Sequence, residues 1–381
     1  MDTKPLHACH LIHALGVGGA EQGLVDLARS CSRAGLRLSV ISLVEDPNPV
    51  QANALRQLGV DVRSLSLPSR WDARAFRRAF RHIDDMRPQV LHSHMKHADL
   101  VGAAVAWRRG LPLVSTMHVI EDAPTAVGRI KGRLATQARS RIADRVIAVS
   151  EAQRRWYTRA YSVAADRVVT IPNGITPPPP PPTPADRRAL RASLGTPEDA
   201  ILALSMSVMR PEKGLDDLLA AAAVLPDDSP IMIVLAGDGD ERPRLEALAD
   251  SDRRIARRVR FAGWRDDAAE LIHAADLLVH PSHADALPTA LILALGAGVP
   301  IVATRVGGIP EIVTEDVGVL VPPRDPVRLA DSISDLAGDT MRRQNMSSAA
   351  RRRFAERYDA AAWARRLVSL YRQVLDERGH A

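Results

Sequence analysis

Residues 280–313 read HPSHADALPTALILALGAGVPIVATRVGGIPEIV. Within them, the 19 residues from 286 to 304 carry no charge, a length that would suit a membrane span. Pro288, Pro300 and the glycines between them interrupt this run, so we interpret it as a buried helix followed by a buried strand. Such a strand, apolar on both faces, is typical of a parallel sheet covered by helices on both sides.

The same alternation of short apolar runs and helical spacing extends along the chain in both directions. In the first half, runs rich in Val, Ile and Leu predict strands at residues 6–15, 36–44, 60–65, 89–92, 113–117, 146–149 and 168–171. In the second half, they predict strands at residues 200–207, 230–236, 258–261, 277–280, 299–303 and 318–321. The pattern predicts an α/β protein of two doubly wound domains, with functional residues in the turns that follow the strands.

A run of six prolines at residues 177–182 divides the two halves, because it favours an extended polyproline conformation. We therefore predict an N-terminal domain at 1–172, a linker at 173–186 and a C-terminal domain at 187–358. The last helix, about 359–381, has an apolar face, which we expect to pack on the N-terminal domain. That face carries Trp363, Leu367, Leu370, Tyr371 and Val374.

Composition and cysteine content narrow the class of protein. The chain is 46% hydrophobic and 25% charged, which indicates a folded globular protein. Its two cysteines, Cys9 and Cys31, form no C-x-x-C pair, so a zinc site or a disulfide scaffold is disfavoured. No signal peptide is readable at the N-terminus, and we expect a cytoplasmic protein.

Charge is unequal between the halves. Residues 1–172 contain 25 Lys and Arg against 15 Asp and Glu (+10), and the remainder contains 26 against 30 (−4). Nucleic acid is disfavoured as a partner, because aromatic residues are only 3% of the chain and do not interleave the basic stretches. An anionic membrane surface, a phosphorylated ligand and solvated arginines remain as alternatives. Membrane contact would involve a helix at 127–142, which carries Arg129, Lys131, Arg133 and Arg139.

Two turns carry features of anion binding. The first, GVGGAE at residues 16–21, follows a strand and opens a helix, so that glycine amides can approach an anion. It lacks the last glycine of G-x-G-x-x-G, which disfavours a dehydrogenase, and a turn without a ligand remains an alternative. In the second, SVMRPEKG at 207–214, Arg210 and Lys213 are expected on one helical face. Two cations there suit a diphosphate, and a solvated pair is the alternative.

Three histidines, His92, His94 and His97, surround the end of a predicted strand. Metal binding is one interpretation, but no carboxylate or thiolate joins them at the spacing of known sites. An ordinary polar strand end is the other. We expect no metal.

Residues 280–313 and five further segments together resemble the retaining glycosyltransferases of family 4, which have the two-domain GT-B fold. The segments are GVGGAE, ADRVIAVSEA (143–152), IPNGI (171–175), RPEKG (210–214) and VLAGDGDERPRLEAL (234–248). The resemblance covers nearly the whole chain. It implies that two domains face across a cleft, the N-terminal one holding an acceptor and the C-terminal one a nucleotide-diphosphate sugar. It also implies transfer with retained anomeric configuration, without a metal or cofactor.

The resemblance also implies roles for individual residues. It places Arg210 and Lys213 on the leaving diphosphate, His118 beside the donor sugar and Asp285 on the sugar hydroxyls. It places His94 and Lys96 on the acceptor side. Donor contacts are implied for Gly18, Gly19, Trp264, Leu287, Pro288, Thr289 and Leu293, with Trp264 either stacking on the base or capping the sheet. We expect the contacts near Leu287, Pro288 and Thr289 to come from backbone amides at a helix N-terminus.

The chain departs from the family where most members carry two Glu separated by seven residues. Asp285 replaces the first and keeps a carboxylate, but Leu293 replaces the second and cannot hydrogen-bond a ribose. A lost charge-assisted hydrogen bond of about 1.5–3 kcal/mol would weaken donor binding roughly ten- to hundredfold. Three functions therefore stay open: a hexosyltransferase, a nucleotide-sugar-binding pseudoenzyme or assembly partner, and a more distant sugar-nucleotide epimerase. The acceptor, a lipid, a glycan or a small metabolite, also stays open.

Overall fold

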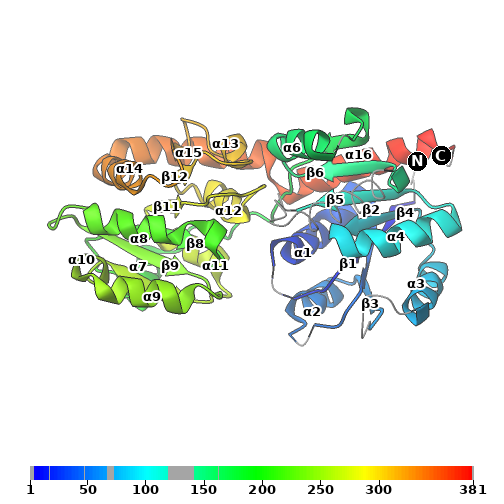
Figure 1. Ribbon diagram of the computed structural model, residues 1–381, viewed down its shortest axis with the longest axis horizontal. Coiled ribbons are helices and arrows are strands. Elements are labelled where there is room, and N and C mark those ends of the chain that lie inside the picture. Colours follow the sequence, from blue (N-terminus) through cyan, green and yellow to red (C-terminus); the bar gives the residue numbers. More distant parts are fainter. Residues whose placement is uncertain are drawn as a thin grey trace. The chain divides into compact units, whose positions relative to one another are not determined.

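The computed structural model describes residues 4–16, 18–46, 48–66, 73–118, 141–161 and 163–379. The chain divides into two compact units (Figure 1). The N-terminal unit comprises Met1–Thr176 and Arg357–Ala381, and the C-terminal unit comprises Pro177–Glu356. Residues 127–140 of the helix predicted for membrane contact, with all four of its basic residues named above, lie outside the described residues.

The N-terminal unit is built on a seven-stranded parallel sheet with the order β3-β2-β1-β4-β5-β6-β7. Its strands are β1 (Leu6–Ile12), β2 (Leu36–Ser42), β3 (Asp61–Ser64), β4 (Val90–His94), β5 (Leu113–Met117), β6 (Arg145–Ala148) and β7 (Val168–Thr170). Every residue of β1, β4 and β5 is buried, as expected for strands with helices on both faces. The seven strands predicted in this half are confirmed.

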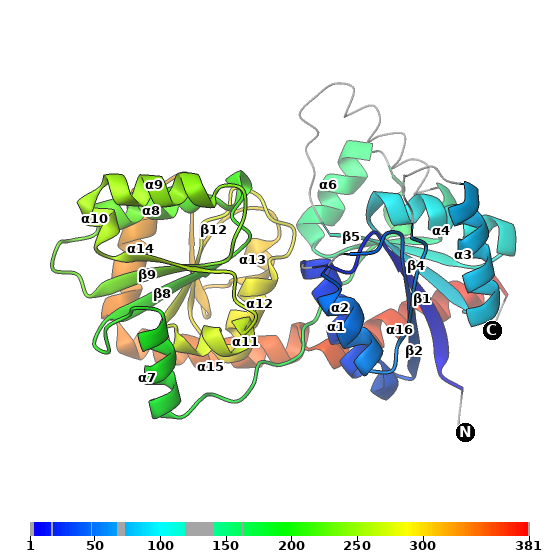
Figure 2. The same ribbon diagram turned by 90° about the horizontal axis from the view of Figure 1, so that it is seen from below.

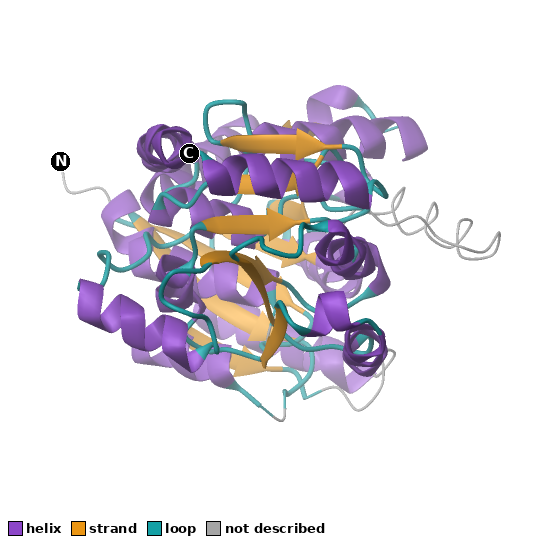
Figure 3. Cartoon of the chain, turned by 90° about the vertical axis from the view of Figure 1, so that its left-hand side faces the viewer, coloured by secondary structure: helices purple, strands orange, loops and turns teal. Residues whose placement is uncertain are grey.

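Figure 3, coloured by secondary structure, shows strands flanked by helices. Helices cover both faces of the seven-stranded sheet of the N-terminal unit. One face packs on α1 (Gly19–Cys31), α2 (Val50–Gln57) and α16 (Ala360–Glu377). The other packs on α3 (Ala73–Met86), α4 (Met95–Arg109) and α6 (Glu151–Tyr161). Helix α16 lies beside α1 (Figure 2) and buries Trp363, Leu367 and Tyr371 in the N-terminal core. Short 3₁₀ turns are η1 (Ser32–Ala34) and η2 (Ala165–Arg167).

The C-terminal unit is built on a six-stranded parallel sheet with the order β10-β9-β8-β11-β12-β13. Its strands are β8 (Ile201–Met206), β9 (Ile231–Ala236), β10 (Val259–Gly263), β11 (Leu277–His280), β12 (Ile301–Thr304) and β13 (Gly318–Val321). All six were predicted. Its helices and 3₁₀ turns are α7 (Pro184–Ser193), η3 (Pro211–Lys213), α8 (Leu215–Val224), α9 (Arg242–Ser251), α10 (Arg253–Ala256), α11 (Ala268–Leu271), η4 (Ile272–Ala274), α12 (Thr289–Ala297), α13 (Ile309–Ile312), α14 (Pro326–Gly338) and α15 (Thr340–Arg357).

Helix α7 begins inside the segment that we predicted as linker. The Thr183 side chain caps it by accepting a hydrogen bond from the amide of Asp186, and Pro184 supplies a preset φ angle for the first turn. The extended proline segment therefore ends at Thr183.

The strand order reverses once in each sheet. In the N-terminal unit β1 pairs with both β2 and β4, and in the C-terminal unit β8 pairs with both β9 and β11. The connections that follow the two central strands lead to opposite sides at such a point, and ligands of doubly wound sheets bind there. Candidate functional residues are therefore sought after β1 and β4, and after β8 and β11.

Candidate functional site

In the C-terminal unit, the switch point between β8 and β11 brings together Lys213 and Asp285. Lys213 ends the turn η3 that follows β8, and Asp285 lies in the loop that follows β11. Lys213 Nζ lies 2.6 Å from Asp285 Oδ2, with the two side chains 21% and 13% exposed. The pair is thus sheltered but reachable from solvent.

Two glycines allow the segments around this pair to approach one another. Gly214 has φ +61°, and a Cβ there would lie 2.3 Å from the carbonyl oxygen of Pro281. Gly307 has φ +50°, and a Cβ there would lie 1.8 Å from the carbonyl oxygen of Asp285. That carbonyl accepts a hydrogen bond from the amide of Gly308 at 3.1 Å. Any side chain at Gly214 or Gly307 would push the Lys213 turn or the Asp285 loop out of place.

The surroundings of Asp285 keep its carboxylate ionised. His280 Nε2 lies 3.1 Å from Asp285 Oδ2 and 2.9 Å from Ser282 Oγ. Burial would raise the pKa of Asp285, but the hydrogen bond with His280 and the charge of Lys213 outweigh it and lower that pKa to about 2. The site therefore presents an ammonium held by a carboxylate, and an approaching anion would compete with Asp285 for Lys213.

Arg210 does not share a helical face with Lys213, so that prediction is wrong. Its backbone is extended, at φ −129° and ψ 158°, because it precedes Pro211. The first residue of α8 is Leu215, after the left-handed Gly214. The Arg210 carbonyl accepts a hydrogen bond from the amide of Lys213 at 3.0 Å, but its exposed side chain makes no hydrogen bond or ion pair with the residues that the structure describes. Its guanidinium can reach a ligand, but nothing described fixes it in place.

The predicted donor contacts near the start of α12 need one correction. Pro288 is the N-cap of this helix and has no N–H, so it cannot donate to a nucleotide. The first turn leaves the amides of Thr289 and Ala290 without intrahelical partners. Leu287 precedes the helix and is buried, whereas Leu293 lies on the helix and is half-buried. Donor contacts at Leu287, Thr289 and Leu293 stay predictions.

Trp264 follows β10 with 48% of its surface exposed. Its Nε1–H donates to Asp266 Oδ1 at 2.7 Å, which fixes the edge of the indole and leaves much of the ring in solvent. The exposed ring is accessible to a base, and stacking there stays a prediction.

In the N-terminal unit, the predicted glycine turn starts α1. Gly18 is the extended N-cap residue, and Gly19 is the first helical residue. A Cβ on Gly18 would lie 2.2 Å from Oε2 of Glu21, so the Glu21 carboxylate folds over the turn. Burial, with a smaller contribution from Asp46, raises the pKa of Glu21. A phosphate that approached Gly18 or Gly19 would meet this carboxylate first.

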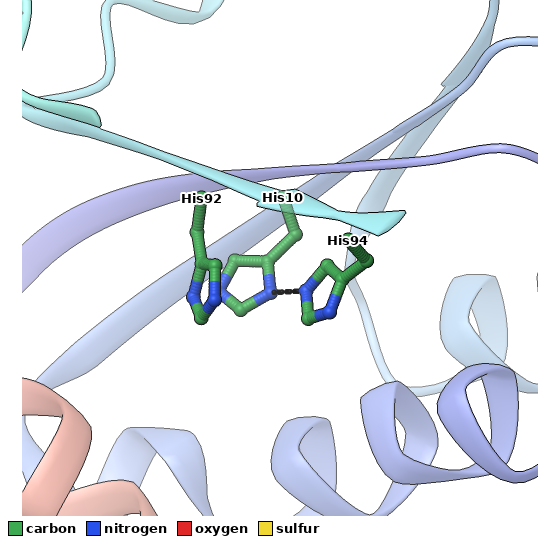
Figure 4. Close-up of side chains that lie close together, drawn as sticks. All are labelled: His10, His92 and His94. Carbon is green, nitrogen blue, oxygen red and sulfur yellow. Dashed lines mark hydrogen bonds between the residues drawn. The ribbon is translucent and has the colours of Figure 1, made fainter. Parts of the chain in front are cut away.

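The switch point between β1 and β4 holds a cluster of histidines. His10 of β1 pairs in register with His92 of β4, and His94 lies two residues further on the same face. Figure 4 shows the three rings side by side below the two strands. His94 Nδ1 lies 2.8 Å from Nε2 of His118, which follows β5. His97 is not part of this cluster, since its ring lies 5.1 Å from that of His13. The Lys96 side chain lies outside the described part of the chain.

Burial keeps these histidines neutral. It lowers the pKa of His10 to about 3 and that of His118 to about 4. It also lowers the pKa values of His92 and His94 far below the usual range, with smaller contributions from the neighbouring rings. Ligand atoms of His10, His92 and His94 lie within 4.8 Å of one another, and neutral imidazoles can bind metals. However, both ring nitrogens of each already hydrogen-bond within the protein, so we assign no metal there.

Sequence reasoning missed His10, Tyr371 and His280. The signal for His10 was a histidine in the middle of an apolar strand. The usual order of a doubly wound sheet places the first and fourth strands side by side, which would have joined His10 to His92. Tyr371 was assigned only to the apolar face of α16, and no local pattern connects it to strands about 280 and 360 residues away in the sequence.

Both units of the chain match known protein families. Residues 17–177 match the family described as Glycosyltransferase Family 4, and residues 186–353 match the family described as Glycosyl transferases group 1. A D-inositol 3-phosphate glycosyltransferase of Xylanimonas cellulosilytica is 32% identical over 332 residues, which are 79% of this chain and 76% of that protein. One of Thermobispora bispora is 31% identical over 77% of this chain and 72% of that protein.

Solved structures show the same fold. Anabaena Alr3699/HepE, determined in complex with UDP, aligns over 97% of this chain and all of that chain, with a TM-score of 0.83 and 24% identity. The same protein in complex with UDP-glucose gives a TM-score of 0.82. A glycosyltransferase from Rickettsia africae aligns over 97% of this chain and 99% of that chain, with a TM-score of 0.81 and 17% identity. These similarities identify the two-domain GT-B fold.

Proposed function

The chain belongs to the family 4 glycosyltransferases, and we propose that it transfers a hexose or modified hexose from a nucleotide-diphosphate sugar to an acceptor hydroxyl. The observation that carries this proposal is the Lys213–Asp285 pair at the switch point of the C-terminal unit. A cation held ready at the carboxyl end of a parallel sheet suits a leaving group that gains negative charge.

Glycosyl transfer requires that the negative charge on the leaving diphosphate be neutralised. The bond from the anomeric carbon to the diphosphate breaks, and the diphosphate departs with its electron pair. The acceptor oxygen bonds to the same carbon, and the proton of the acceptor hydroxyl passes to an oxygen of the departing diphosphate. Lys213, fixed by Asp285 before the reaction, neutralises the departing charge without having to reorganise. Arg210, exposed beside it, adds a second cation. We propose that the reaction retains the anomeric configuration and needs no metal.

Similar proteins suggest which substrates to test first. UDP-glucose is the first donor to test, because Alr3699/HepE was determined in complex with UDP and with UDP-glucose. D-inositol 3-phosphate is the first acceptor to test, since several relatives are named for it. A phosphorylated acceptor also suits the basic N-terminal half. Lipid and glycan acceptors are tested beside it. In the described ranges, no helix is both long and apolar enough to cross a bilayer.

The experiment proceeds in two steps. A thermal-shift screen of nucleotide sugars finds the donor, because a ligand that binds only the native state raises the melting temperature. The protein, donor and acceptor are then incubated with and without EDTA, and the product is analysed by NMR. We expect a product with the donor's anomeric configuration at an unchanged rate in EDTA. An inverted product or a metal requirement would contradict the mechanism. Binding without transfer to any acceptor would indicate a pseudoenzyme, and sugar conversion without an acceptor an epimerase.

A further inference from the structure

A continuous chain of hydrogen bonds crosses the N-terminal unit beneath α16 and ends at His118. It links Thr116 to His92 (2.6 Å), His92 to the Tyr371 hydroxyl (2.5 Å), and that hydroxyl to His10 (3.1 Å). From His10 it continues to His94 (2.9 Å, the dashed line in Figure 4) and from His94 to His118 (2.8 Å).

The topology of the sheet builds this chain. Successive side chains of a strand point to opposite faces of the sheet. His10 of β1 pairs in register with His92 of β4, and His94 of β4 with Thr116 of β5, so all four side chains lie on one face. The apolar residues of that face pack on α1 and α16. Tyr371 enters from α16 and joins His92 to His10, which do not hydrogen-bond each other directly.

The state of protonation restricts the direction of every bond. Burial lowers the pKa of each of the four histidines, so each ring is neutral and carries one N–H donor and one acceptor nitrogen. The Tyr371 hydroxyl has one proton and lies between two rings, so it donates to one and accepts from the other. All donors along the chain therefore point the same way, either toward His118 or toward Thr116.

Thr116 decides between the two directions. If the donors point toward His118, the Thr116 hydroxyl donates its proton in a hydrogen bond to His92 Nε2. If they point the other way, His92 donates to Thr116 Oγ1. The buried hydroxyl proton of Thr116 then has no acceptor, in a side chain or in the backbone, among the residues that the structure describes. A buried donor without a partner is disfavoured, so the first direction is preferred.

We propose that this chain holds His118 in the tautomer with its proton on Nδ1, so that His118 donates a hydrogen bond to an oxygen of the donor sugar or of the acceptor. In this arrangement His92, His10 and His94 also carry their protons on Nδ1, and each Nε2 accepts. Tyr371, His10, His92, His94 and Thr116 are positioning residues for His118. Only the identity of the oxygen rests on the proposed function.

The tautomer limits what His118 can do. Its Nε2 lone pair is occupied by His94 Nδ1–H, and its Nδ1 carries the proton. Neither nitrogen is free to take a proton from an acceptor hydroxyl, so His118 binds an oxygen lone pair and does not act as a general base.

The test is NMR of the full-length protein with ¹⁵N-labelled histidine at neutral pH, because the nitrogen shifts distinguish a protonated from an unprotonated ring nitrogen. We expect Nδ1–H tautomers for His10, His92, His94 and His118, which single His→Gln variants assign. An Nε2–H tautomer at any of the four would overturn the proposal. No substrate is needed, so this result stands whether or not glycosyl transfer is found.

Variants test the coupling along the chain. Tyr371→Phe keeps the ring and removes the central hydroxyl, and we expect mixed tautomers at His10, His94 and His118. If the proposed function holds, kcat falls about five- to tenfold, the value of one hydrogen bond. Tyr161→Phe is the matched control, since it removes a hydroxyl of the same unit outside the chain, and it should change neither readout. Unmixed tautomers in folded Tyr371→Phe would contradict the coupling.

A second pair of variants keeps the test decisive if Tyr371→Phe does not fold. Thr116→Val removes the hydroxyl that sets the direction of the donors along the chain, and it changes the shape of the side chain very little. We expect Nε2–H forms to appear at His92 and along the chain. Thr116→Ser restores the hydroxyl and should restore the Nδ1–H tautomers. Equal spectra for the valine and serine variants would show that Thr116 does not set the direction.

Discussion

The histidine chain of the N-terminal unit and the Lys213–Asp285 pair of the C-terminal unit occupy the same topological position. Each lies where the first and fourth strands of a parallel sheet run side by side. Their electrostatics are opposite. His10 is completely buried and neutral, whereas Lys213 is 21% exposed and paired with an ionised carboxylate. An ionisable side chain that is completely buried with no opposite charge nearby is neutral, whereas one that is partly buried beside an opposite charge stays ionised.

The largest expected effect of this difference is on stability in acid. The folded-state pKa values of His10, His92 and His94 lie below the ordinary 6.5, so the unfolded chain binds more protons than the folded one below that pH. Their contribution to stability is complete above pH 6.5 and is lost as the pH falls through their lowered folded-state pKa values, which for His10 is about 3. A histidine that stays neutral in the folded state costs about 1.4 kcal/mol of stability per pH unit below 6.5, which is a large amount against the marginal stability of a domain.

The C-terminal pair responds at lower pH. The pKa of Asp285 is lowered from 3.8 to about 2, so its stabilising contribution is complete above pH 3.8 and is lost as the pH falls through 2. Between pH 4 and 6, hydrogen-exchange mass spectrometry should show loss of protection in β1 and β4 before β8 and β11. Simultaneous loss of protection in both units would mean that the histidines do not govern acid unfolding.

Removing the cation of the C-terminal pair should have the next largest effect. Lys213→Ala should reduce glycosyl transfer at least about a hundredfold, because one preorganised charge at the leaving group is worth roughly 3 kcal/mol. Initial rates at saturating donor measure it. Lys4→Ala, which removes an exposed lysine near the N-terminus, is the control and should leave the rate unchanged. Near-normal turnover by folded Lys213→Ala would remove Lys213 from the mechanism.

Neutralising the anion of the pair should separate binding from catalysis. Asp285→Asn keeps the shape of the side chain but frees Lys213 from its partner. UDP, tested as a nucleotide diphosphate, should then bind a few-fold tighter by calorimetry, since the competing negative charge is gone. Transfer should fall about tenfold, because Lys213 is no longer held and the sugar loses a charged contact. If UDP binding weakens instead, Asp285 supports the nucleotide and does not compete with it.

The smallest expected effect concerns Leu293. The half-buried Leu293 lies on α12, at the position where the resemblance to the family implies a carboxylate in contact with the ribose. Leu293→Glu should tighten nucleotide binding by up to about tenfold, limited by the cost of burying the new carboxylate. UDP binding to both variants is measured by calorimetry, with Leu293→Gln as the control. Glutamine is uncharged and similar in size to glutamate, so the difference between the two variants gives the effect of the charge. Unchanged or weaker binding in a folded Leu293→Glu variant would indicate that the ribose does not lie against this position.

The two regions also differ in how far the sequence predicts them. The thirteen strands in the described part of the chain were predictable, because most of their residues are buried and such parallel strands have short apolar sequences. Lys213 and Asp285 were found through motifs whose order along the chain resembles a family, and the structure brings them together. Arg210 was misplaced, since the restriction that Pro211 imposes on the preceding residue was overlooked. The histidine chain was missed because it is made by register and by a helix from the far end of the chain, which no local pattern encodes.

The central claim is that Lys213, the cation of the charged pair in the C-terminal unit, holds the nucleotide diphosphate. Hydrogen-exchange mass spectrometry of the full-length protein with and without UDP tests it most directly, because it needs neither the acceptor nor the sugar. We predict that UDP protects the amides at residues 207–217 and 280–293, and that Lys213→Ala abolishes this protection at the same UDP concentration. Bound UDP that left both segments unprotected, or protection that persisted in full in Lys213→Ala, would contradict the account.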